Sequence, residues 1–413
     1  MSSQKHFLVA GGGLAGLTAS IELALAGHSV ELHEQSKTLG GRAATHSHQG
    51  FAMNIGPHGF YRAGPMQQQF DAWGIAYSGR PPFGKGDAFL IAGGNKYRFP
   101  GDAAGLLRCA AFTIGEKLSL GKLMKALPKA TARPGESMQE WIHQQSTRPA
   151  IHNFLQAMTR LSTYCAIPEK LDAEAGLKQL QIATKASVLY LDGGWETLIT
   201  ALAAKARSLG VAIHTDSAVT AVESGEAQFL NSCRPAVGIV LAIPPRAVEQ
   251  LTSRTLPKLI PARAACLDLG LRRLPAKAGT FALGLDESTY VSVHSAYASG
   301  LAPAGGALVQ LAMYLSTGET CTREELEQRA DLILPGWRNE LVYARFLPEM
   351  TVVHAIPAAH QPRPDVDALA LPNVMLAGDW VGPEAMLADA AVSSGLRAAR
   401  RLIAQVAVGQ AAA

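Results

Sequence analysis

The chain has 413 residues, of which 48% are hydrophobic and 17% are charged, and its formal net charge is +4. A disordered chain would be more polar and more strongly charged, and the scattered Lys and Arg residues form no run that would indicate nucleic-acid binding. The length suffices for a two-domain enzyme with a large buried core.

The five cysteines are far apart, odd in number and form no CxxC pair. A disulfide framework is therefore not expected, and the pattern favours a reducing cytoplasm. His46 and His48 lie two residues apart without a neighbouring cysteine or carboxylate, so we expect no metal site. Residues 7–27 carry one charge, at Glu22, but glycines interrupt the run. A buried strand and helix explain this stretch better than a membrane span or a signal peptide.

The first predicted elements form a strand-helix-strand unit. Residues 6–10 are typical of a short buried strand, residues 14–26 of a helix that ends at Gly27, and residues 29–33 of a second strand. The alternation between strand and helix periods predicts an α/β fold with a parallel sheet.

The turn between the first strand and the helix has the spacing Gly11-x-Gly13-x-x-Gly16. Gly11 allows a tight turn, Gly13 lets the backbone approach a pyrophosphate, and Gly16 lets the helix pack close to the strand. The free N–H groups at the start of the helix then bind the phosphates.

An acidic residue follows this unit at the distance that dinucleotide binding needs. Glu34 lies 18 residues after Gly16, where a carboxylate accepts hydrogen bonds from an adenosine ribose. Glu31 is an alternative, but the alternation of side chains along the strand places Glu34 at its open carboxyl end. The unit therefore predicts a bound adenine dinucleotide.

A short polar turn then leads to Gly40-Gly41-Arg42. With these residues, the segment from Gly11 to Arg42 resembles the opening of the flavin amine oxidase and phytoene desaturase superfamily. The resemblance implies that the dinucleotide is FAD, and that Arg42 and the Gly41 amide lie near its diphosphate or flavin. A guanidinium neutralises charge there in a fork geometry that lysine cannot copy.

The resemblance also implies a Rossmann-like FAD-binding domain of the GR2 type with an inserted α+β substrate-binding domain. The loop Asn54-x-Gly56-Pro57-His58 resembles the second flavin-contacting loop of the family, which often carries an acid at the position of Asn54. This resemblance implies that His58 lies near the flavin ring. A purely structural role for this histidine is an equally good interpretation.

Between residues 61 and 189 the pattern changes to helices with one hairpin, whose turn is Ala92-Gly-Gly-Asn95. Helical periods cover residues 118–127, 137–145 and 151–161, and the second begins with a capping box of Ser137 and Glu140. This segment is expected to be the inserted domain. The FAD-binding domain then comprises residues 1–75, 188–250 and 350–413, and the substrate-binding domain comprises residues 76–187 and 251–349.

One helical stretch is both basic and amphipathic, since Lys117, Lys122, Lys125 and Lys129 alternate with leucines. Such a helix either makes a peripheral contact with a membrane surface or exposes a solvated face. We favour the solvated face.

The chain then returns to the dinucleotide domain. Asp192-Gly-Gly-Trp-Glu196 opens a helix over residues 197–209, and strands follow at 211–215 and 219–222. Residues 238–245 form a buried strand that ends in a proline turn. By resemblance, the backbone of Val219 contacts the adenine.

The strand-like runs between residues 267 and 315 re-enter the substrate-binding domain. Leu301-Ala-Pro-x-Gly305 resembles a stretch of phytoene desaturases, carotenoid isomerases and retinol saturases.

The C-terminal segment reads as a strand over residues 373–377, then Gly378-Asp379, then a helix over residues 387–403. The resemblance implies that this second helix start lies at the flavin. Amides near Leu387 and Ala388 would then stabilise negative charge on the reduced ring. Asp379 would bind the ribityl or diphosphate region.

The chemistry is less determined than the cofactor. Flavin amine oxidases often have an aromatic cage and a lysine that helps dioxygen react, but the cage tyrosine position falls at Leu387 and residues 262–269 contain no lysine. Both departures favour hydride removal from a largely apolar small molecule, as in a desaturase or dehydrogenase, with flavin N5 as acceptor. A flavin amine oxidase that uses dioxygen is the alternative. A non-enzymatic binding protein similar to Rab GDP-dissociation inhibitors is disfavoured because the flavin elements are retained.

The expected sites fall into two groups, and no metal is expected. The catalytic candidates are His58, His294 and Tyr297. The expected FAD-binding residues are Gly11, Gly13, Leu14, Ala15, Gly16, Glu34, Gly41, Arg42, Gly56, Pro57, His58, Val219, Gly378, Asp379, Leu387 and Ala388.

Overall fold

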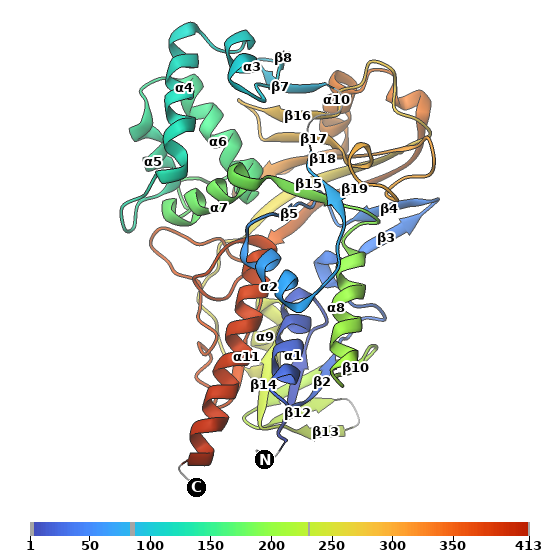
Figure 1. Ribbon diagram of the computed structural model, residues 1–413, viewed down its shortest axis with the longest axis vertical. Helices are drawn as coiled ribbons and strands as arrows, with labels where there is room; N and C mark the ends of the chain where they lie inside the picture. Colours follow the sequence, from blue (N-terminus) through green and yellow to red (C-terminus); the bar gives the residue numbers. More distant parts are fainter. Residues whose placement is uncertain (1–3, 83–86, 230–231, 412–413) are drawn as a thin grey trace.

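The computed structural model describes residues 4–82, 87–229 and 232–411. A five-stranded parallel sheet carries the N-terminal unit (Figure 1). The predicted first and second strands are confirmed as β1 (His6–Ala10) and β2 (Ser29–His33). The sheet order is β10-β2-β1-β14-β20, with β10 (Ala212–His214), β14 (Gly238–Leu241) and β20 (Val374–Leu376) from distant parts of the chain.

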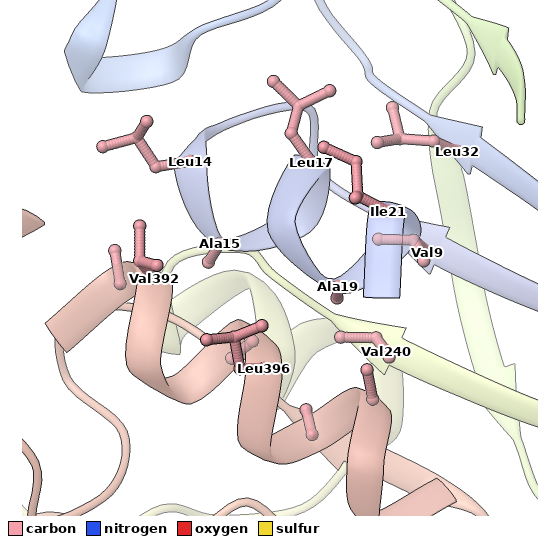
Figure 2. Close-up of a cluster of buried hydrophobic side chains, with 14 of the residues drawn as sticks. Val9, Leu14, Ala15, Leu17, Ala19, Ile21, Leu32, Val240, Val392 and Leu396 are labelled. Carbon is pink, nitrogen blue, oxygen red and sulfur yellow. The ribbon is translucent and has the colours of Figure 1, made fainter. Parts of the chain in front are cut away.

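Two helices from opposite ends of the chain pack together beside this sheet. Helix α1 (Leu14–Leu25) follows β1, and helix α11 (Leu387–Ala411) follows β20. Figure 2 shows Val392 and Leu396 of α11 facing Ala15 of α1 in one apolar cluster. A Cβ atom on Gly395 would lie 2.5 Å from the Ala15 carbonyl oxygen, so the close approach of the two helices requires glycine there.

The remaining elements of this half cover the sheet and its edges. Helix α8 (Glu196–Ser208) contacts α1, and α9 (Pro245–Thr252) contacts β11. The strands β11 (Val219–Glu223), β12 (Glu226–Phe229) and β13 (Ser232–Pro235) form a small antiparallel sheet. The apolar core here surrounds β1, β14 and α1, which is why these elements read as nearly continuous hydrophobic runs.

A second, seven-stranded sheet lies at the other end of the molecule (Figure 1). Its order is β19-β15-β18-β17-β16-β7-β8, and its pairs are antiparallel except for β16 with β7. The strands are β7 (Ala88–Ala92), β8 (Asn95–Arg98), β15 (Ala262–Leu271), β16 (Phe281–Gly284), β17 (Thr289–Val293), β18 (Ala307–Leu315) and β19 (Leu341–Val353).

The two faces of this sheet bury different partners. Along β16, Phe281 and Leu283 point to the helical side, whereas Ala282 points to the side covered by α10 (Arg323–Ile333). This is the alternation that period-2 strands require. The helical layer consists of α3 (Ala103–Arg108), α4 (Ile114–Ala126), α5 (Met138–Gln145), α6 (Pro149–Thr163) and α7 (Ala173–Ala186).

Several local predictions for this region are confirmed. The Ala92–Asn95 turn joins β7 to β8 as a hairpin. The capping box is present, since the Ser137 hydroxyl accepts from the Glu140 amide at 3.2 Å and the Glu140 carboxylate accepts from the Ser137 amide at 2.8 Å.

Short strands mark where the chain passes between the two halves. Strand β5 (Phe60–Tyr61) leaves the parallel sheet region, and β9 (Val188–Leu191) returns beside it, with β6 (Gly79–Arg80) on the other side of β9. Helix α2 (Pro65–Trp73) follows β5. The chain therefore crosses between the two halves near residues 61 and 188, and the domain boundaries expected from the sequence stay a prediction. His46 and His48 lie in β3 (Thr45–His48), which forms a hairpin with β4 (Phe51–Asn54). None of the described helices combines the length and the apolar character that a membrane span needs.

Candidate cofactor and substrate site

One cavity of about 510 Å³ runs along the carboxyl ends of β1 and β2 toward the seven-stranded sheet. Its wall combines the first and last parts of the chain. Of the expected FAD-binding residues, all but two line it: Gly11, Gly13, Leu14, Ala15, Glu34, Gly41, Arg42, Pro57, His58, Val219, Gly378, Asp379, Leu387 and Ala388. The roles of the individual residues remain predictions.

The three motif glycines differ in what requires them. Gly11 has a φ of +105°, and a Cβ atom there would lie 2.3 Å from the Ala242 carbonyl oxygen. A Cβ atom on Gly16 would lie 1.9 Å from the Gly11 carbonyl oxygen. The fold itself therefore requires glycine at these two positions.

Gly13 is different, because a Cβ atom there would meet only the Gly40 carbonyl oxygen, at 3.7 Å. Its φ of −84° and ψ of −172° are open to any residue. Gly13 lines the cavity, so the space beside it is open to a ligand. This is the arrangement expected where a diphosphate approaches the backbone.

The start of α1 is also suited to an anion. No side chain caps the helix, and its first turn contains no acidic residue. Leu14 and Ala15, whose amides belong to this first turn, line the cavity. Uncapped amides and the positive end of the helix dipole favour a phosphate group at this point.

Glu34 lies in the wall, as the sequence predicted, and its carboxylate is held in place. One oxygen accepts from the Gly12 amide at 2.7 Å and the other from the Ser36 amide at 2.8 Å. Glu31 is not among the lining residues; its carboxylate lies 3.3 Å from Nε2 of His33. Glu34, and not Glu31, therefore lies in the cavity wall, and its contact with a ribose stays a prediction.

Arg42 and Asp379, separated by most of the chain, form an ion pair in the middle of the wall. Nη1 of Arg42 donates to Oδ2 of Asp379 at 2.8 Å, and Nη2 donates to Oδ1 at 2.5 Å. Burial alone would raise the pKa of Asp379, but the Arg42 charge and the bonds from His354 and Arg42 hold this pKa well below its ordinary value. The carboxylate is therefore ionised, and the pair ties the glycine-rich segment to the C-terminal segment.

A second arginine orients the loop that leads from Asp379 into α11. Arg363 is buried, and it donates to the carbonyl oxygens of Asp379 at 2.8 Å, Glu384 at 3.1 Å and Ala385 at 2.8 Å. The loop ends at Leu387, whose φ is +55°. Such a backbone conformation is uncommon for leucine, so the surrounding contacts must hold the start of α11 at the cavity.

Aromatic side chains line the part of the cavity near His58. Tyr61 donates its hydroxyl to the Ser162 carbonyl at 2.7 Å, and Tyr164 donates to the Pro57 carbonyl at 3.0 Å. Trp195 packs edge-on against His58, with 5.0 Å between ring centroids. Both tyrosine hydroxyls already have partners, so the rings present mainly apolar surface to the cavity.

His58 is held neutral at this end of the cavity. Burial lowers the pKa of His58, although hydrogen bonds to the backbone of Gly56, whose carbonyl is 2.9 Å from Nδ1, and of Arg42 oppose this shift. A neutral imidazole can accept a proton from a bound molecule.

The other two catalytic candidates lie away from the cavity wall. His294 is buried, stacks on Tyr190 with 3.9 Å between centroids, and has Nε2 3.0 Å from the Tyr290 hydroxyl. Tyr297 is buried and donates to the Thr280 hydroxyl at 3.0 Å. Neither lines the cavity. Gly16 and Gly56 are likewise outside its wall.

Some lining residues were missed from the sequence. Trp195 belongs to the Asp192–Glu196 stretch, which was recognised only as a helix start. Tyr61, Tyr164 and Met350 stand in no recognised motif, so no local signal identified them.

Comparison with known proteins agrees with this arrangement. The family model for flavin-containing amine oxidoreductases matches residues 14–403. A segment of 53 residues is 45% identical to 4,4'-diaponeurosporene oxygenase of Staphylococcus aureus, but this match covers 13% of the chain and 11% of that protein.

Solved structures match over nearly the whole chain. An oxidoreductase from Methanosarcina mazei superposes with a TM-score of 0.75 at 18% identity, covering 96% of this chain and 100% of the other. Cyclohexylamine oxidase from Brevibacterium oxydans superposes with a TM-score of 0.69 at 15% identity, covering 98% and 99%. At these identities the structural matches establish the fold alone.

Proposed function

Because the chain belongs to the family of flavin-containing amine oxidoreductases and is an FAD-dependent oxidoreductase, we propose that it removes hydride from a largely apolar small molecule. The reaction class that we propose is a desaturation or dehydrogenation. When bound, FAD supplies the hydride acceptor. The residues of this chain bind and orient that cofactor and shape the apolar space beside it.

The observation that carries this proposal is how the acidic side chains in the cavity wall are bonded. Among the residues that the structure describes, two carboxylates line the cavity, Glu34 and Asp379. The first accepts from two backbone amides, and the second faces Arg42 and His354. Glu34 has no cationic partner but lies at the carboxyl end of β2, where the ribose is expected, so a protonated amine would find no unpaired carboxylate beside the apolar part of the described wall. An uncharged, apolar molecule meets no such penalty.

The aromatic end of the cavity fits the same kind of substrate. Tyr61, Tyr164 and Met350 present rings and a thioether, and Leu387 stands where amine oxidases often carry a cage tyrosine. Apolar contacts of this kind bind by excluding water and impose little polar selectivity. We infer that they hold a hydrocarbon-like or polycyclic substrate, and that the short match to a carotenoid-modifying oxygenase is in keeping with this class.

We propose that the His58 imidazole accepts the proton that leaves when a new double bond forms. The His58 ring lines the cavity, and burial lowers its pKa and so favours the neutral imidazole, which is the form that accepts a proton. His294 and Tyr297 lie behind the wall, so we assign them no direct contact with the substrate.

The alternative function, oxidation of a C–N bond with dioxygen, keeps the same cofactor and the same fold. It gains support from the fold shared with cyclohexylamine oxidase, a protein named for an amine. A non-enzymatic binding role remains disfavoured, because the family match and the retained Arg42–Asp379 pair indicate a flavoprotein.

Anaerobic reduction of the bound flavin distinguishes the two enzymatic functions. The holoenzyme is mixed with apolar polyenes or with simple cyclic and aliphatic amines, and the loss of flavin absorbance is followed. We expect bleaching with a polyene and none with the amines. Fast bleaching by simple amines would overturn the proposal.

Two variants of one wall residue report where the substrate binds. Tyr164→Phe keeps the ring and should retain the reduction rate, whereas Tyr164→Ala removes apolar surface and should raise the substrate concentration needed for half-maximal reduction. Equal behaviour of the two variants would place the substrate elsewhere.

A further inference from the structure

Three of the large hydrophobic side chains with the highest exposure lie together on the outermost helices of the second half. Leu107 of α3 is 66% exposed, and Ile114 and Leu118 of α4 are 77% and 61% exposed. Helices α3 and α4 contact each other, and the ammonium of Lys117 donates to the Leu107 carbonyl at 2.7 Å. In Figure 1 these helices lie at the end of the molecule opposite to both termini.

The exposed face of α4 changes character along its length. Ile114 and Leu118 are one turn apart, and Lys122 and Lys125 continue the same face. Leu120 points to the opposite side and is buried. The helix thus presents two apolar side chains followed by basic ones, while its other face packs into the core.

The basic residues of this surface have no acidic partner among the described residues. Lys122 and Lys125 of α4, and Lys129 of the short helix η2 (Leu127–Lys129) that continues it, take part in no ion pair that the described residues form. The two nearby acids are engaged in helix caps: Glu116 accepts from the Thr113 amide at 2.7 Å, and Asp102 accepts from the Gly105 amide at 2.6 Å. The surface is therefore apolar and positively charged at the same time.

We propose that α3 and α4 form a docking surface for a lipid bilayer that contains anionic headgroups. Leu107, Ile114 and Leu118 insert among the acyl chains near the headgroups, and the unpaired lysines contact the lipid phosphates. Lysines without acidic partners, beside apolar side chains, are complementary to the charge and the apolar interior of an anionic bilayer. The same apolar patch facing water would have an unfavourable free energy of hydration. The sequence alone favoured a solvated face for this helix, and the exposed apolar side chains beside the lysines are the reason that we now propose the membrane contact.

The surface also has a link to the cavity. Leu120 and Leu127, which anchor α4, belong to the same apolar cluster against which Tyr164, Met350 and Leu387 of the cavity wall pack. Docking would bring the substrate-binding half to the phase in which apolar molecules dissolve. This consequence rests on the proposed function, but bilayer binding itself does not.

Co-sedimentation with vesicles tests the docking surface. The flavin-loaded protein is mixed with vesicles of pure phosphatidylcholine or of phosphatidylcholine and phosphatidylglycerol in equal parts. We expect binding to the mixed vesicles that weakens as salt is added. The triple variant K122Q/K125Q/K129Q should bind about 100-fold more weakly, since each lysine near an anionic surface changes the binding constant about fivefold. Ile114→Ser with Leu118→Ser should also lose binding.

Matched control variants separate this surface from general effects. Leu25→Ser with Val342→Ser removes exposed hydrophobics elsewhere, at 48% and 40% exposure, and should bind like the wild type. The triple variant K170Q/K258Q/K277Q removes three exposed lysines elsewhere and should lose much less binding. Flavin content and thermal midpoint, measured for every variant, identify any that fail to fold.

The outcomes are decisive in both directions. Equal vesicle binding by the wild type and the α4 variants would overturn the proposal, and so would equal binding to neutral and anionic vesicles. If the wild type does not bind vesicles but forms a dimer, and the Ile114 and Leu118 substitutions make it monomeric, the surface binds a second copy of the chain. That result would overturn the proposal. Vesicle binding without flavin reduction by polyenes would leave docking intact and overturn the proposed substrate class.

Discussion

Replacement of Gly13 by valine separates binding of the cofactor from folding of the protein. The φ and ψ of Gly13 suit a β-branched residue, and a Cβ atom there meets nothing closer than the Gly40 carbonyl oxygen at 3.7 Å. Valine restricts the unfolded chain more than glycine does, which stabilises the folded variant by about 0.4–1 kcal/mol. Valine is also a poorer N-cap residue for α1 than glycine, and this destabilises the variant by about the same amount. The free energy of unfolding of the cofactor-free protein should therefore change by less than about 1 kcal/mol.

The effect on the cofactor is expected to be large, because the new side chain occupies the space between the start of α1 and a diphosphate. Each hydrogen bond to a charged group contributes about 1.5–3 kcal/mol. Loss of two such bonds weakens binding by at least about 100-fold. FAD affinity is measured by fluorescence titration, and occupancy by absorbance of the purified protein. Gly101→Val is the control, since Gly101 is exposed and a Cβ atom there has no neighbour within 4 Å.

Two results would refute this reasoning about Gly13. Wild-type flavin occupancy in Gly13→Val would show that the diphosphate does not lie at the start of α1. Loss of folding in the cofactor-free variant would show that the fold, and not the ligand, requires this glycine.

Three further predictions follow from the buried charges and close contacts. Asp379→Asn should lower flavin occupancy and reduce the free energy of unfolding in urea by about 1–3 kcal/mol. This loss is smaller than for a fully buried pair because the Arg42 side chain is 40% exposed. An unchanged free energy of unfolding would mean that the ion pair contributes nothing to stability. Burial raises the pKa of Asp389 to about 7, so its folded form keeps a proton that the unfolded chain releases near pH 4. The stabilisation from this group is complete below about pH 4 and is lost as pH rises through about 7, by up to about 4 kcal/mol. The Asp389→Asn variant still accepts from the Met66 amide, so it should keep the fold but remove this pH dependence. Urea titrations at several pH values measure the difference. Gly16→Ala places a methyl group 1.9 Å from a backbone oxygen and should destabilise the cofactor-free protein by about 3 kcal/mol or more; a wild-type thermal midpoint would contradict this contact.

The local elements of the nucleotide half were predictable because short-range geometry determines them. The strands at residues 6–10 and 29–33 and the turn at Gly11 follow from hydrophobic period and from backbone conformations that only glycine adopts readily. The capping box at Ser137 and the hairpin at Ala92–Asn95 were equally local and are confirmed. The family and the cofactor also followed from the sequence, because the glycine spacing and Arg42 stand close together in the chain.

The composition of the cavity wall was only partly predictable. The expected FAD-binding residues lie in the wall, except Gly16 and Gly56. Gly16 serves the packing of α1 on the turn before it, and Gly56 lies against Met350 and Cys266. A motif shows that a glycine is needed, but not whether a ligand or a neighbouring chain segment lies beside it.

The sequence by itself determined the strand-helix-strand unit, the dinucleotide motif and the type of cofactor, since all of these depend on residues near one another in the chain. Only the tertiary structure decided that Arg42 binds Asp379, that His294 and Tyr297 lie behind the wall, and that Ile114 and Leu118 remain exposed. The physical reason is that ion pairs between distant segments, and the burial of a given side chain, depend on how sheets and helices pack together. Period and spacing along the chain carry little information about that packing.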